Sequence, residues 1–396
     1  MTTLDQGATR DIFVTGRRGV RHNGVRRANE KTVLTVIAFN SGASNAEISR
    51  ISELAPQTVS AILVDLESEG LIVRGPVLRG RRGQPATPIL LNADGGFAFG
   101  VEMGWKHFEI VLINMHAEIL RHHREDYDYP DADIVFDKIG GLLADFEHSL
   151  RPDQHARLLD VGLALPGSLT TDLDLLGAPS DQVSRWCQID PVAELGKRTH
   201  LEVTQINDGN AGCWAELIAL DPPRPANVIF LLVSEVLLAG IVSDGQLWEG
   251  PSGHAADLGS SLVCINQGTP QLAHQVASLF ALRERLAAAG FAQADQPVSD
   301  WDLQGMSTIV DCWVGDAAQA LAQVVHNMLV VLESPVVVLD CELGPDMAQR
   351  LTERLGIEMS RFKTRGFKMP RVINGRHGRL APAIGAAELP LYRRYF

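Results

Sequence analysis

Residues 44–70 read SNAEISRISELAPQTVSAILVDLESEG. This stretch predicts two short amphipathic helices separated by one turn, because apolar residues recur at helical spacing on both sides of Pro56. Ser44 and Glu47 form a capping-box pattern at the start of the first helix, and Pro56 suits the first turn of the second. Gly70 can end that second helix in the left-handed conformation. Two helices joined in this way form a helix-turn-helix, which places its second helix in the major groove of DNA.

A further helix is expected before this pair, from Asn29 to a turn at Gly42, with its apolar residues on one face. In the second helix of the pair, the expected buried residues are Val59, Ile62, Leu63 and Leu66. Gln57, Thr58 and Ser60 then face outward, where a recognition helix meets base edges. The amide of Gln57 has the paired donor and acceptor that match adenine, so these three residues are candidate base contacts.

A hairpin follows the third helix. Residues 71–74 and 89–91 have strand composition, and the glycine-rich tip between them carries Arg79, Arg81 and Arg82. Such a hairpin is typical of the wing of a winged helix. We therefore expect a winged helix-turn-helix over residues 26–91; the alternative is a generic small helical bundle with a polar loop.

The charge distribution supports DNA binding. The chain has a net charge of -13, yet residues 1–91 hold 12 Lys and Arg against 8 Asp and Glu, so this part carries +4 and the remainder -17. Residues 1–25 are expected to form a basic arm, and Arg17, Arg18, Arg21, Arg26 and Arg27 are the arginines expected in the arm before the first helix. Since the third helix has no Lys or Arg between Ala55 and Glu69, the arm and the wing are expected to contact the phosphates. The expected partner is a double-stranded DNA operator.

Length and composition limit the other classes of protein. The chain has 396 residues, of which 45% are hydrophobic and 21% charged, as in a folded protein of about two or three domains. No apolar stretch reaches the ~20 residues of a membrane span, and we expect no secretory signal before the basic arm. The five cysteines are scattered and never form a Cys-x-x-Cys pair: Cys187, Cys213, Cys264, Cys312 and Cys341. This pattern favours reduced thiols in the cytoplasm.

After a polar linker at residues 92–96, strands and helices alternate. Strands are expected at 97–103, 108–115, 119–123, 161–165 and 203–206, with helices at 133–150 and from 207 to 220. The pattern then repeats, with strands at 228–233, 238–243 and 336–339 and helices at 271–289, 306–332 and 346–355. Two successive units of antiparallel strands and crossover helices predict a two-lobed α/β protein with a cleft between the lobes.

Four motifs resemble those of the ROK family of bacterial repressors and sugar kinases. Residues 83–86 (GQPA) look like its wing segment, 162–167 (GLALPG) like its Gly-x-x-x-Pro-Gly turn, 206–211 (INDGNA) like its Glu-Asn-Asp-Ala-Asn-Ala motif, and 383–387 (AIGAA) like its closing helix. The resemblance covers nearly the whole chain from about residue 29. It implies an actin-like, ribonuclease H-like domain after the winged helix. Lobe 1 would span residues 97–207, lobe 2 residues 208–379, and the helix at 380–396 would return to lobe 1.

The sequence departs from the kinase members of this family where they hold ATP. Their first phosphate turn, Asp-x-Gly-Gly-Thr, corresponds to residues 102–106 (EMGWK), so Trp105 stands at a glycine position. Their second, Gly-Thr-Gly-Ile-Gly-Ala-Gly, corresponds to residues 234–240 (SEVLLAG), where glycines are lost and Glu235 adds a negative charge. Residues 340–342 (DCE) replace a third glycine cluster. Because backbone N–H groups cannot cradle phosphate there, we expect no ATP cofactor, no catalytic residue and no kinase activity.

The resemblance also implies a site for a small hydroxylated ligand. Its candidate residues are Asn207, Asp208, Asp257, Ser260 and His274. Asn207 and Asp208 match sugar-contacting residues of the family, and Asp257 keeps a carboxylate where Glu is usual. Carboxylates and amides suit vicinal hydroxyls because they offer paired hydrogen bonds in one plane. The alternatives are that Asp208 only caps a helix, that Asp257 lies in a solvated turn, and that Ser260 and His274 have structural roles.

The zinc site of the family is reduced to a single thiol. Ser260 stands where the family has a histidine, and Cys264 remains of three closely spaced cysteines. One thiol cannot supply a tetrahedral set, so no metal is expected. Trp105, Trp186 and Trp248 are interpreted as core residues rather than sugar platforms.

The leading hypothesis is a repressor of carbohydrate-related genes that senses a sugar, polyol or related ligand through a kinase-like domain without kinase activity. Two-fold operators need two modules, so a homodimer or larger assembly is expected. One alternative is a sugar kinase with a DNA-binding end. Another is a regulator whose ROK-like domain only dimerises or docks a protein.

Overall fold

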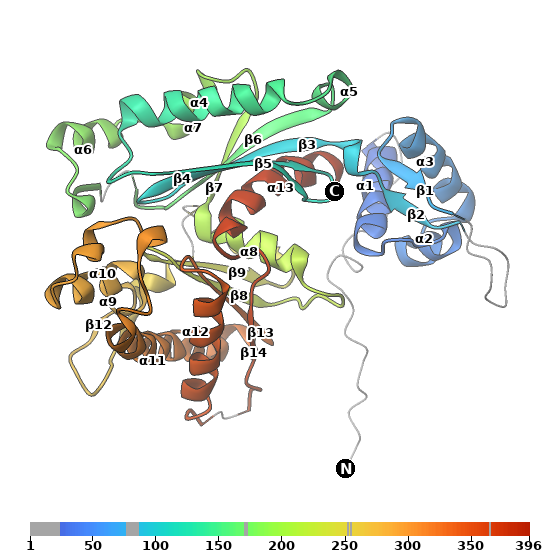
Figure 1. The fold of residues 1–396 in the computed structure, drawn as a ribbon. Coiled ribbons are helices and arrows are strands. Elements are labelled where there is room, and N and C mark those ends of the chain that lie inside the picture. Colours follow the sequence, from blue (N-terminus) through green and yellow to red (C-terminus); the bar gives the residue numbers. More distant parts are fainter. Residues whose placement is uncertain (1–23, 77–86, 170–172, 252, 254–255, 364–365) are drawn as a thin grey trace, which may run out of the picture.

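The computed structural model describes residues 24–76, 87–169, 173–251, 253, 256–363 and 366–396. They form a small N-terminal helical unit and two α/β lobes, each built on a five-stranded sheet. Figure 1 shows the helical unit beside the end of lobe 1 at which the C-terminus also lies. The two-lobed α/β fold expected from the sequence is confirmed.

The N-terminal unit contains three helices and one antiparallel strand pair. These are α1 (Gly24–Phe39), α2 (Asn45–Ser52), α3 (Pro56–Ser68), β1 (Ile72–Arg74) and β2 (Ile89–Leu91). α1 begins earlier than the Asn29 expected from the sequence. The tip between β1 and β2, with Arg79, Arg81 and Arg82, lies outside the described residues.

Local chemistry sets the ends of these helices. At α2 the backbone N–H of Ser44 donates to a carboxylate oxygen of Glu47 at 2.8 Å, while the Ser44 hydroxyl oxygen accepts from the Glu47 N–H, so the expected capping box is present. Pro56 occupies the first turn of α3. Gly42 and Gly70 have φ values of +82° and +72°, a region that L side chains rarely adopt, and they mark the turns after α1 and α3.

Lobe 1 is built on a mixed sheet with strand order β5-β4-β3-β6-β7. The strands are β3 (Phe97–Met103), β4 (His107–Asn114), β5 (Ile119–Asp126), β6 (Leu158–Leu165) and β7 (Val203–Asn207). The α-helices between its strands are α4 (Ala132–His148), α5 (Pro152–His155), α6 (Ser180–Trp186) and α7 (Pro191–Gly196). Every residue of β3 and β4 is buried, because α4 and the C-terminal helix lie on opposite faces of the sheet (Figure 1).

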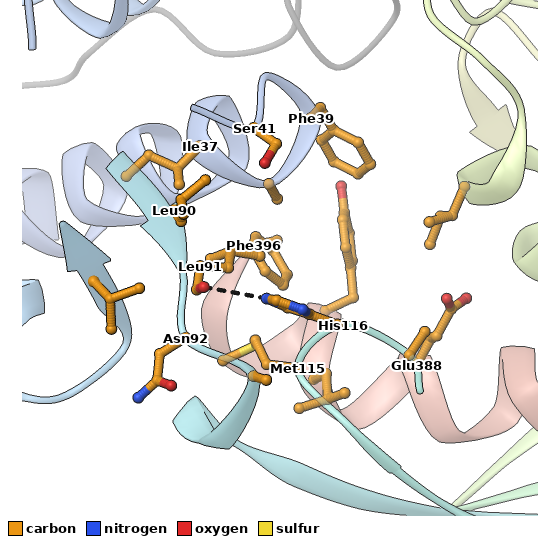
Figure 2. Close-up of a pocket in the computed structure, with 17 residues that line it drawn as sticks. Ile37, Phe39, Ser41, Leu90, Leu91, Asn92, Met115, His116, Glu388 and Phe396 are labelled. Carbon is orange, nitrogen blue, oxygen red and sulfur yellow. Dashed lines mark hydrogen bonds between the residues drawn. The ribbon is translucent and has the colours of Figure 1, made fainter. Parts of the chain in front are cut away.

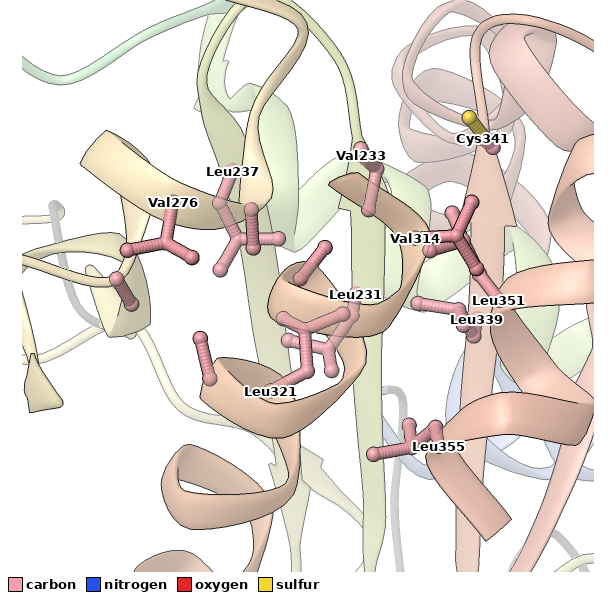
Figure 3. Packing of buried hydrophobic residues seen from close by; sticks show 14 of the residues in the cluster. Leu231, Val233, Leu237, Val276, Val314, Leu321, Leu339, Cys341, Leu351 and Leu355 are labelled. Atoms are coloured by element: carbon pink, nitrogen blue, oxygen red, sulfur yellow. The ribbon is translucent and has the colours of Figure 1, made fainter. Parts of the chain in front are cut away.

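Lobe 2 has the strand order β10-β9-β8-β13-β14. The strands are β8 (Val228–Val233), β9 (Leu237–Ser243), β10 (Gln246–Leu247), β13 (Val336–Cys341) and β14 (Arg371–Asn374), with a small separate pair, β11 (Leu262–Val263) and β12 (Gln271–Leu272). The helices are α9 (His274–Ala277), α10 (Leu279–Ala288), α11 (Ser307–Leu332) and α12 (Pro345–Met359). Figure 3 shows Leu231 and Leu339 of the sheet packing with Leu321 of α11 and Leu351 of α12. No described helix combines the length and apolarity needed to cross a membrane.

Two helices, α8 (Asp208–Ala219) and α13 (Ala381–Tyr395), lie between the two sheets (Figure 1). Their backbones approach closely. A Cβ at Gly385 would overlap the carbonyl oxygen of Ala211, and a Cβ at Gly162 of β6 would overlap that of Ala386. Only glycine fits at such positions. This packing holds the first residues of α8 in a fixed place between the lobes.

Two details differ from the sequence-based expectation. A single helix was expected over residues 271–289, but the chain forms β12, α9 and α10 there, because Ser278 has extended φ and ψ of −120° and 166° and its side chain accepts from the Ala281 N–H. Trp248 is 55% exposed and is not a core residue. Trp105 and Trp186 are buried in lobe 1, as expected.

Candidate functional site

The candidate DNA-reading residues lie together on one exposed surface of α3. Gln57, Thr58 and Ser60 are exposed, whereas Val59 is fully buried in the core of the N-terminal unit. The Asn45 side-chain amide of α2 donates to the Ser60 hydroxyl oxygen at 2.8 Å, which fixes the start of α3 against α2. The side chains that could meet base edges therefore project from a helix that two neighbours hold in place.

Arg26 and Arg27 lie on α1 rather than in a flexible arm. The Arg26 guanidinium forms an ion pair with Asp65 of α3 and another with Glu30. Arg27 is exposed. Arg26 is therefore engaged within the N-terminal unit, and Arg27 is the more accessible of the two for a phosphate.

The candidate ligand site is centred where β7 ends and α8 begins. Asn207 is the N-cap of α8, and its side-chain oxygen accepts from the Asn210 N–H at 3.1 Å. Asp208 is the first helical residue, and its Oδ1 accepts from the Gly209 N–H at 2.7 Å and from the Asn207 amide at 3.1 Å. The capping role considered for Asp208 thus belongs to Asn207.

Asp208 is a buried carboxyl with an altered protonation equilibrium. It is 4% exposed. Burial, and next the negative charge of Glu102, raise the pKa of Asp208 to about 7. A carboxyl in this state can both donate and accept hydrogen bonds near neutral pH, which suits a sugar hydroxyl.

The other three candidates gather at one turn of lobe 2. Asp257 caps the 3-10 helix Leu258–Ser260, and its carboxylate accepts from the Ser260 hydroxyl and backbone N–H. A Cβ on Gly259 would lie 3.5 Å from Oδ1 of Asp257 and 3.5 Å from Cβ of His274. The charge of Asp257 also contributes to the raised pKa of Asp208. The structure therefore brings Asp257, Ser260 and His274 together and places Asp257 near Asp208.

A second cluster joins the lobes through buried charges. Glu342, just after β13 of lobe 2, accepts from the Arg124 guanidinium of β5 at 2.6 Å and from the Ser234 hydroxyl at 2.5 Å. His107 of β4 lies between two carboxylates, with Nδ1 3.8 Å from Glu342 and Nε2 3.8 Å from Glu102. Glu102 and Ser234 belong to the segments that correspond to the two phosphate turns of kinase members, and Glu342 belongs to the segment that replaces their third glycine cluster. The Arg124–Glu342 pair connects lobe 1 directly to lobe 2.

Opposite charges set the protonation of this second cluster. Burial alone would raise the pKa of Glu342, but His107 and Arg124 lower it. Burial alone would lower the pKa of His107, but Glu102 and Glu342 raise it. Burial raises the pKa of Glu102. Glu342 is thus held as an anion by the protein's own cations.

The bulky residues at the expected phosphate turns have structural partners. Trp105 is 7% exposed and packs in the core of lobe 1. Glu235 is buried and forms an ion pair with Arg283 of α10. Burial raises the pKa of Glu235, against the charge of Arg283. Both side chains are therefore built into the fold.

Three buried side chains could supply ligand atoms to a metal ion. The ligand atoms of Glu102, His107 and Glu109 lie within 4.8 Å of one another. Glu109 already contacts His122 at 2.8 Å, and the Arg124 guanidinium lies 4.0 Å from it. An arginine beside the cluster supplies the positive charge that a cation would bring, so we assign these residues to the ion-pair network.

Sequence reasoning did not single out His107, Arg124 or Glu109. The one local signal was the pair of residues His107 and Glu109 at alternate positions of the run HFEIVLIN of β4, which is buried throughout and is otherwise apolar up to Asn114. A buried charge in a strand needs a partner. The two titratable residues at alternate positions of this run could therefore have indicated a buried ion-pair network.

Comparison with known proteins identifies the family of this chain. The family model described as "ROK family" matches residues 98–392. A xylose repressor from Bacillus spizizenii is 23% identical over 246 residues, which are 61% of this chain and 62% of the repressor. The chain thus spans about three fifths of the length of that relative.

Two solved structures show the same fold. A ROK family transcriptional regulator, a homolog of the E. coli MLC protein, has a TM-score of 0.65 at 20% identity and covers 94% of this chain and 98% of its own. A ROK family glucokinase from Streptomyces griseus, solved with glucose and AMPPNP, has a TM-score of 0.59 at 19% identity and covers 75% of this chain and 99% of its own. The family match spans both lobes and both central helices. The chain belongs to the ROK family.

Proposed function

We propose that this protein is a DNA-binding transcriptional regulator, a repressor, whose two-lobed domain binds a sugar or polyol and does not transfer phosphate. The observation that carries this proposal is the Arg124–Glu342 pair at 2.6 Å, together with the buried carboxylates around it. In this position a kinase needs cationic or backbone N–H groups for a polyphosphate. Here Glu342 and Glu235 present carboxyl groups within the segments where kinase members have glycines.

Electrostatics argue against ATP even though space remains beside the cluster. A cavity of about 590 Å³ is lined by Arg124, Glu342, Asp340, Arg376 and Arg379, among others. The Arg124 guanidinium is paired with Glu342, and that of Arg376 with Asp221. Arg379 lies 3.6 Å from Glu109. A phosphate entering this cavity would compete with Glu342 for the Arg124 guanidinium and would face that buried carboxylate, which repels it.

The class of ligand is inferred from the residues of the candidate ligand site around Asp208. Asn207 and Asp208 offer an amide and a carboxyl at the start of a helix, and Asp257, Ser260 and His274 add polar groups from the facing turn. Such a set can contact vicinal hydroxyls through paired hydrogen bonds. The name of one relative, xylose repressor, supports a carbohydrate-responsive regulator.

The N-terminal unit supplies the DNA-binding part of the proposal. Gln57, Thr58 and Ser60 would contact base edges, and Arg27 with the wing arginines 79, 81 and 82 would contact phosphates. Dimers of such units would read a two-fold operator.

The proposal that the protein does not transfer phosphate is tested by calorimetric titration of the full-length protein with Mg-ATP, in the presence and absence of xylose and glucose. We expect no binding heat and no sugar phosphate. The glycine-restoring variant Trp105→Gly should remain inactive, because the carboxylates of Glu235 and Glu342 persist. Magnesium-dependent sugar phosphorylation by the wild type that is lost in Asp208→Asn would instead make the kinase alternative the better one.

A further inference from the structure

An apolar pocket of about 610 Å³ lies between the N-terminal unit and the rest of the molecule. Figure 2 shows Ile37 of α1 and Leu90 of β2 on one side, and Met115, Glu388 and Phe396 on the other. The second side is formed by the β4–β5 turn, the end of α8 and the C-terminal helix α13. Pockets of this volume and lining hold small organic molecules.

We infer that this pocket is a second ligand site, which binds a small apolar amine and thereby changes the DNA affinity of the N-terminal unit. The effect on DNA rests on the proposed function, whereas the binding of the amine does not. The site is distinct from the one around Asp208, because none of the five candidate sugar-site residues lines it.

Glu388 is the residue that points to a ligand. Its side chain is 5% exposed, and Oε2 is buried without a hydrogen-bond partner among the described residues. Burial, and then the charge of Glu216, raise the pKa of Glu388 well above its usual range. A buried polar group without a partner destabilises the folded protein, so a ligand that pairs with it binds more tightly.

The charge around Glu388 selects a cation. Glu216 lies near it and accepts the backbone N–H groups of Arg376 and His377 at 2.8 and 2.7 Å, so a second carboxyl adds negative potential. An ammonium group placed at Glu388 would favour its ionised form and form a charge-assisted hydrogen bond. An alcohol or a carboxylate of the same shape lacks this gain.

Aromatic rings suit the body of such an amine. Phe39, Tyr392 and Phe396 line the pocket. The Arg224 guanidinium lies 4.7 Å from the ring centroid of Phe39, so one of these rings already stacks against a cation. Aromatic faces attract both apolar groups and ammonium groups.

Helix α8 links this pocket to the sugar site. It begins at Asp208 and has 12 residues, a length of about 18 Å, and Ile218 near its end lines the pocket. α8 packs tightly against α13, which supplies Glu388. A ligand between α1 and these two helices therefore contacts the elements that connect the N-terminal unit to the sugar site.

The experiment uses 2-phenylethylamine as probe, with 2-phenylethanol and phenylacetate as neutral and anionic analogues. Each is titrated calorimetrically into the full-length protein at neutral pH. We expect the amine to bind the wild type at least about tenfold more tightly than either analogue. Glu388→Gln should remove this preference, and Ala38→Phe, which fills the pocket, should weaken all three. Glu284→Gln, at an exposed glutamate of α10, is the matched control and should bind like the wild type.

Equal binding of amine and alcohol by the wild type, or an amine preference that survives in Glu388→Gln, would overturn the site. Circular dichroism checks folding; if Glu388→Gln is unfolded, Ala38→Phe and the analogue comparison decide. DNA affinity is then measured by fluorescence anisotropy with a duplex selected by the protein from a random library. Amine binding without a change in DNA affinity would refute the coupling. A protein that selects no DNA would refute the proposed function and leave the binding result intact.

Discussion

Two buried carboxyl groups of this protein, those of Asp208 and Glu342, have pKa values that are shifted in opposite directions. Asp208 lacks a cationic partner among the described contacts, and burial raises its pKa to about 7. Glu342 is equally buried, but His107 and Arg124 hold its pKa below the usual range. The difference in partners therefore gives one carboxyl suited to a neutral hydroxylated ligand and one that serves as a structural anion.

The pKa of Asp208 predicts a pH-dependent stability. Its pKa is about 7 in the folded protein against an ordinary 3.8 in the unfolded chain, so the folded state binds the proton more tightly. Stability from this group is therefore full below about pH 4 and is lost as the pH rises towards 7, by roughly 4 kcal/mol. Asp208→Asn stays neutral and should not show this loss. Urea unfolding at about pH 5 and about pH 8 measures the difference.

The exposed variant Glu284→Gln is the control for this comparison and should retain the wild-type pH dependence. If Asp208→Asn loses as much stability between the two pH values as the wild type, the carboxyl of Asp208 titrates normally. That result would remove the electrostatic basis for its role as a hydroxyl-binding group.

Some of these residues could be predicted from the sequence and others could not. The position of Asn207 and Asp208 at a strand-to-helix junction follows from local composition, and the structure places them there. We considered Asp208 as a possible cap of α8, but in the structure Asn207 is the cap. Which of these two neighbours caps the helix depends on the backbone conformation at a single turn. Arg124 and Glu342 are 218 positions apart, so their pairing depends on how the lobes close, which no local pattern encodes.

At the scale of elements, the contact between α8 and α13 holds the middle of the molecule. Each helix is positioned by glycines that allow backbone-to-backbone approach, at Gly209 against Ala239, at Gly385 against Ala211 and at Gly162 against Ala386. α8 begins at the candidate sugar site, and α13 borders the N-terminal unit. The close α8–α13 contact therefore connects the sugar site with the N-terminal unit.

This packing predicts contrasting effects for two glycine-to-alanine changes in helices. Gly385→Ala should lower the free energy of unfolding by about 1–3 kcal/mol, since its Cβ would overlap the Ala211 carbonyl oxygen. Gly141→Ala in α4 has open space around its Cβ and should raise it by about 0.5–1 kcal/mol. Thermal and urea unfolding of both variants provide the measurement. Equal effects would contradict the close helix contact.

The helices with local end signals were predictable, and the interrupted one was not. The capping box of α2 and the proline of α3 place both helices within a residue or two, as sequence chemistry requires. Residues 271–289 have enough apolar residues for one helix, but Ser278 starts a new one through its side chain. A serine inside a helical pattern can cap or continue a helix, and tertiary packing decides between them.

At the scale of the whole molecule, two of the contact regions between the lobes and the N-terminal unit differ in their chemistry. The lobes are joined by the buried charges of Arg124, His107 and Glu342. The N-terminal unit meets lobe 1 and α13 around an apolar pocket. The order of the parts along the chain was predictable from motifs and composition. These two contact regions were not, since each combines segments far apart in the sequence.

Together these contacts support a molecule in which a sugar at the start of α8 alters the N-terminal unit through α8 and α13. Allosteric coupling of this kind is typically about 1–3 kcal/mol, or about fivefold to 150-fold in affinity. Arg124, Arg376 and Arg379 line the cavity beside Glu342, and each of them lies close to a carboxylate of the protein. The central claim is therefore that sugar binding, without phosphoryl transfer, changes DNA affinity.

The most direct test is the affinity of the full-length protein for a selected DNA duplex, measured by fluorescence anisotropy with and without a panel of pentoses, hexoses and polyols and without ATP. We expect at least one of these ligands to change the wild-type affinity by about tenfold or more. Asp208→Ala should bind the duplex alone like the wild type but lose the response, whereas Asp295→Ala, at an exposed aspartate of lobe 2, should keep it. An unchanged affinity with every ligand, or a full response in Asp208→Ala, would contradict the account.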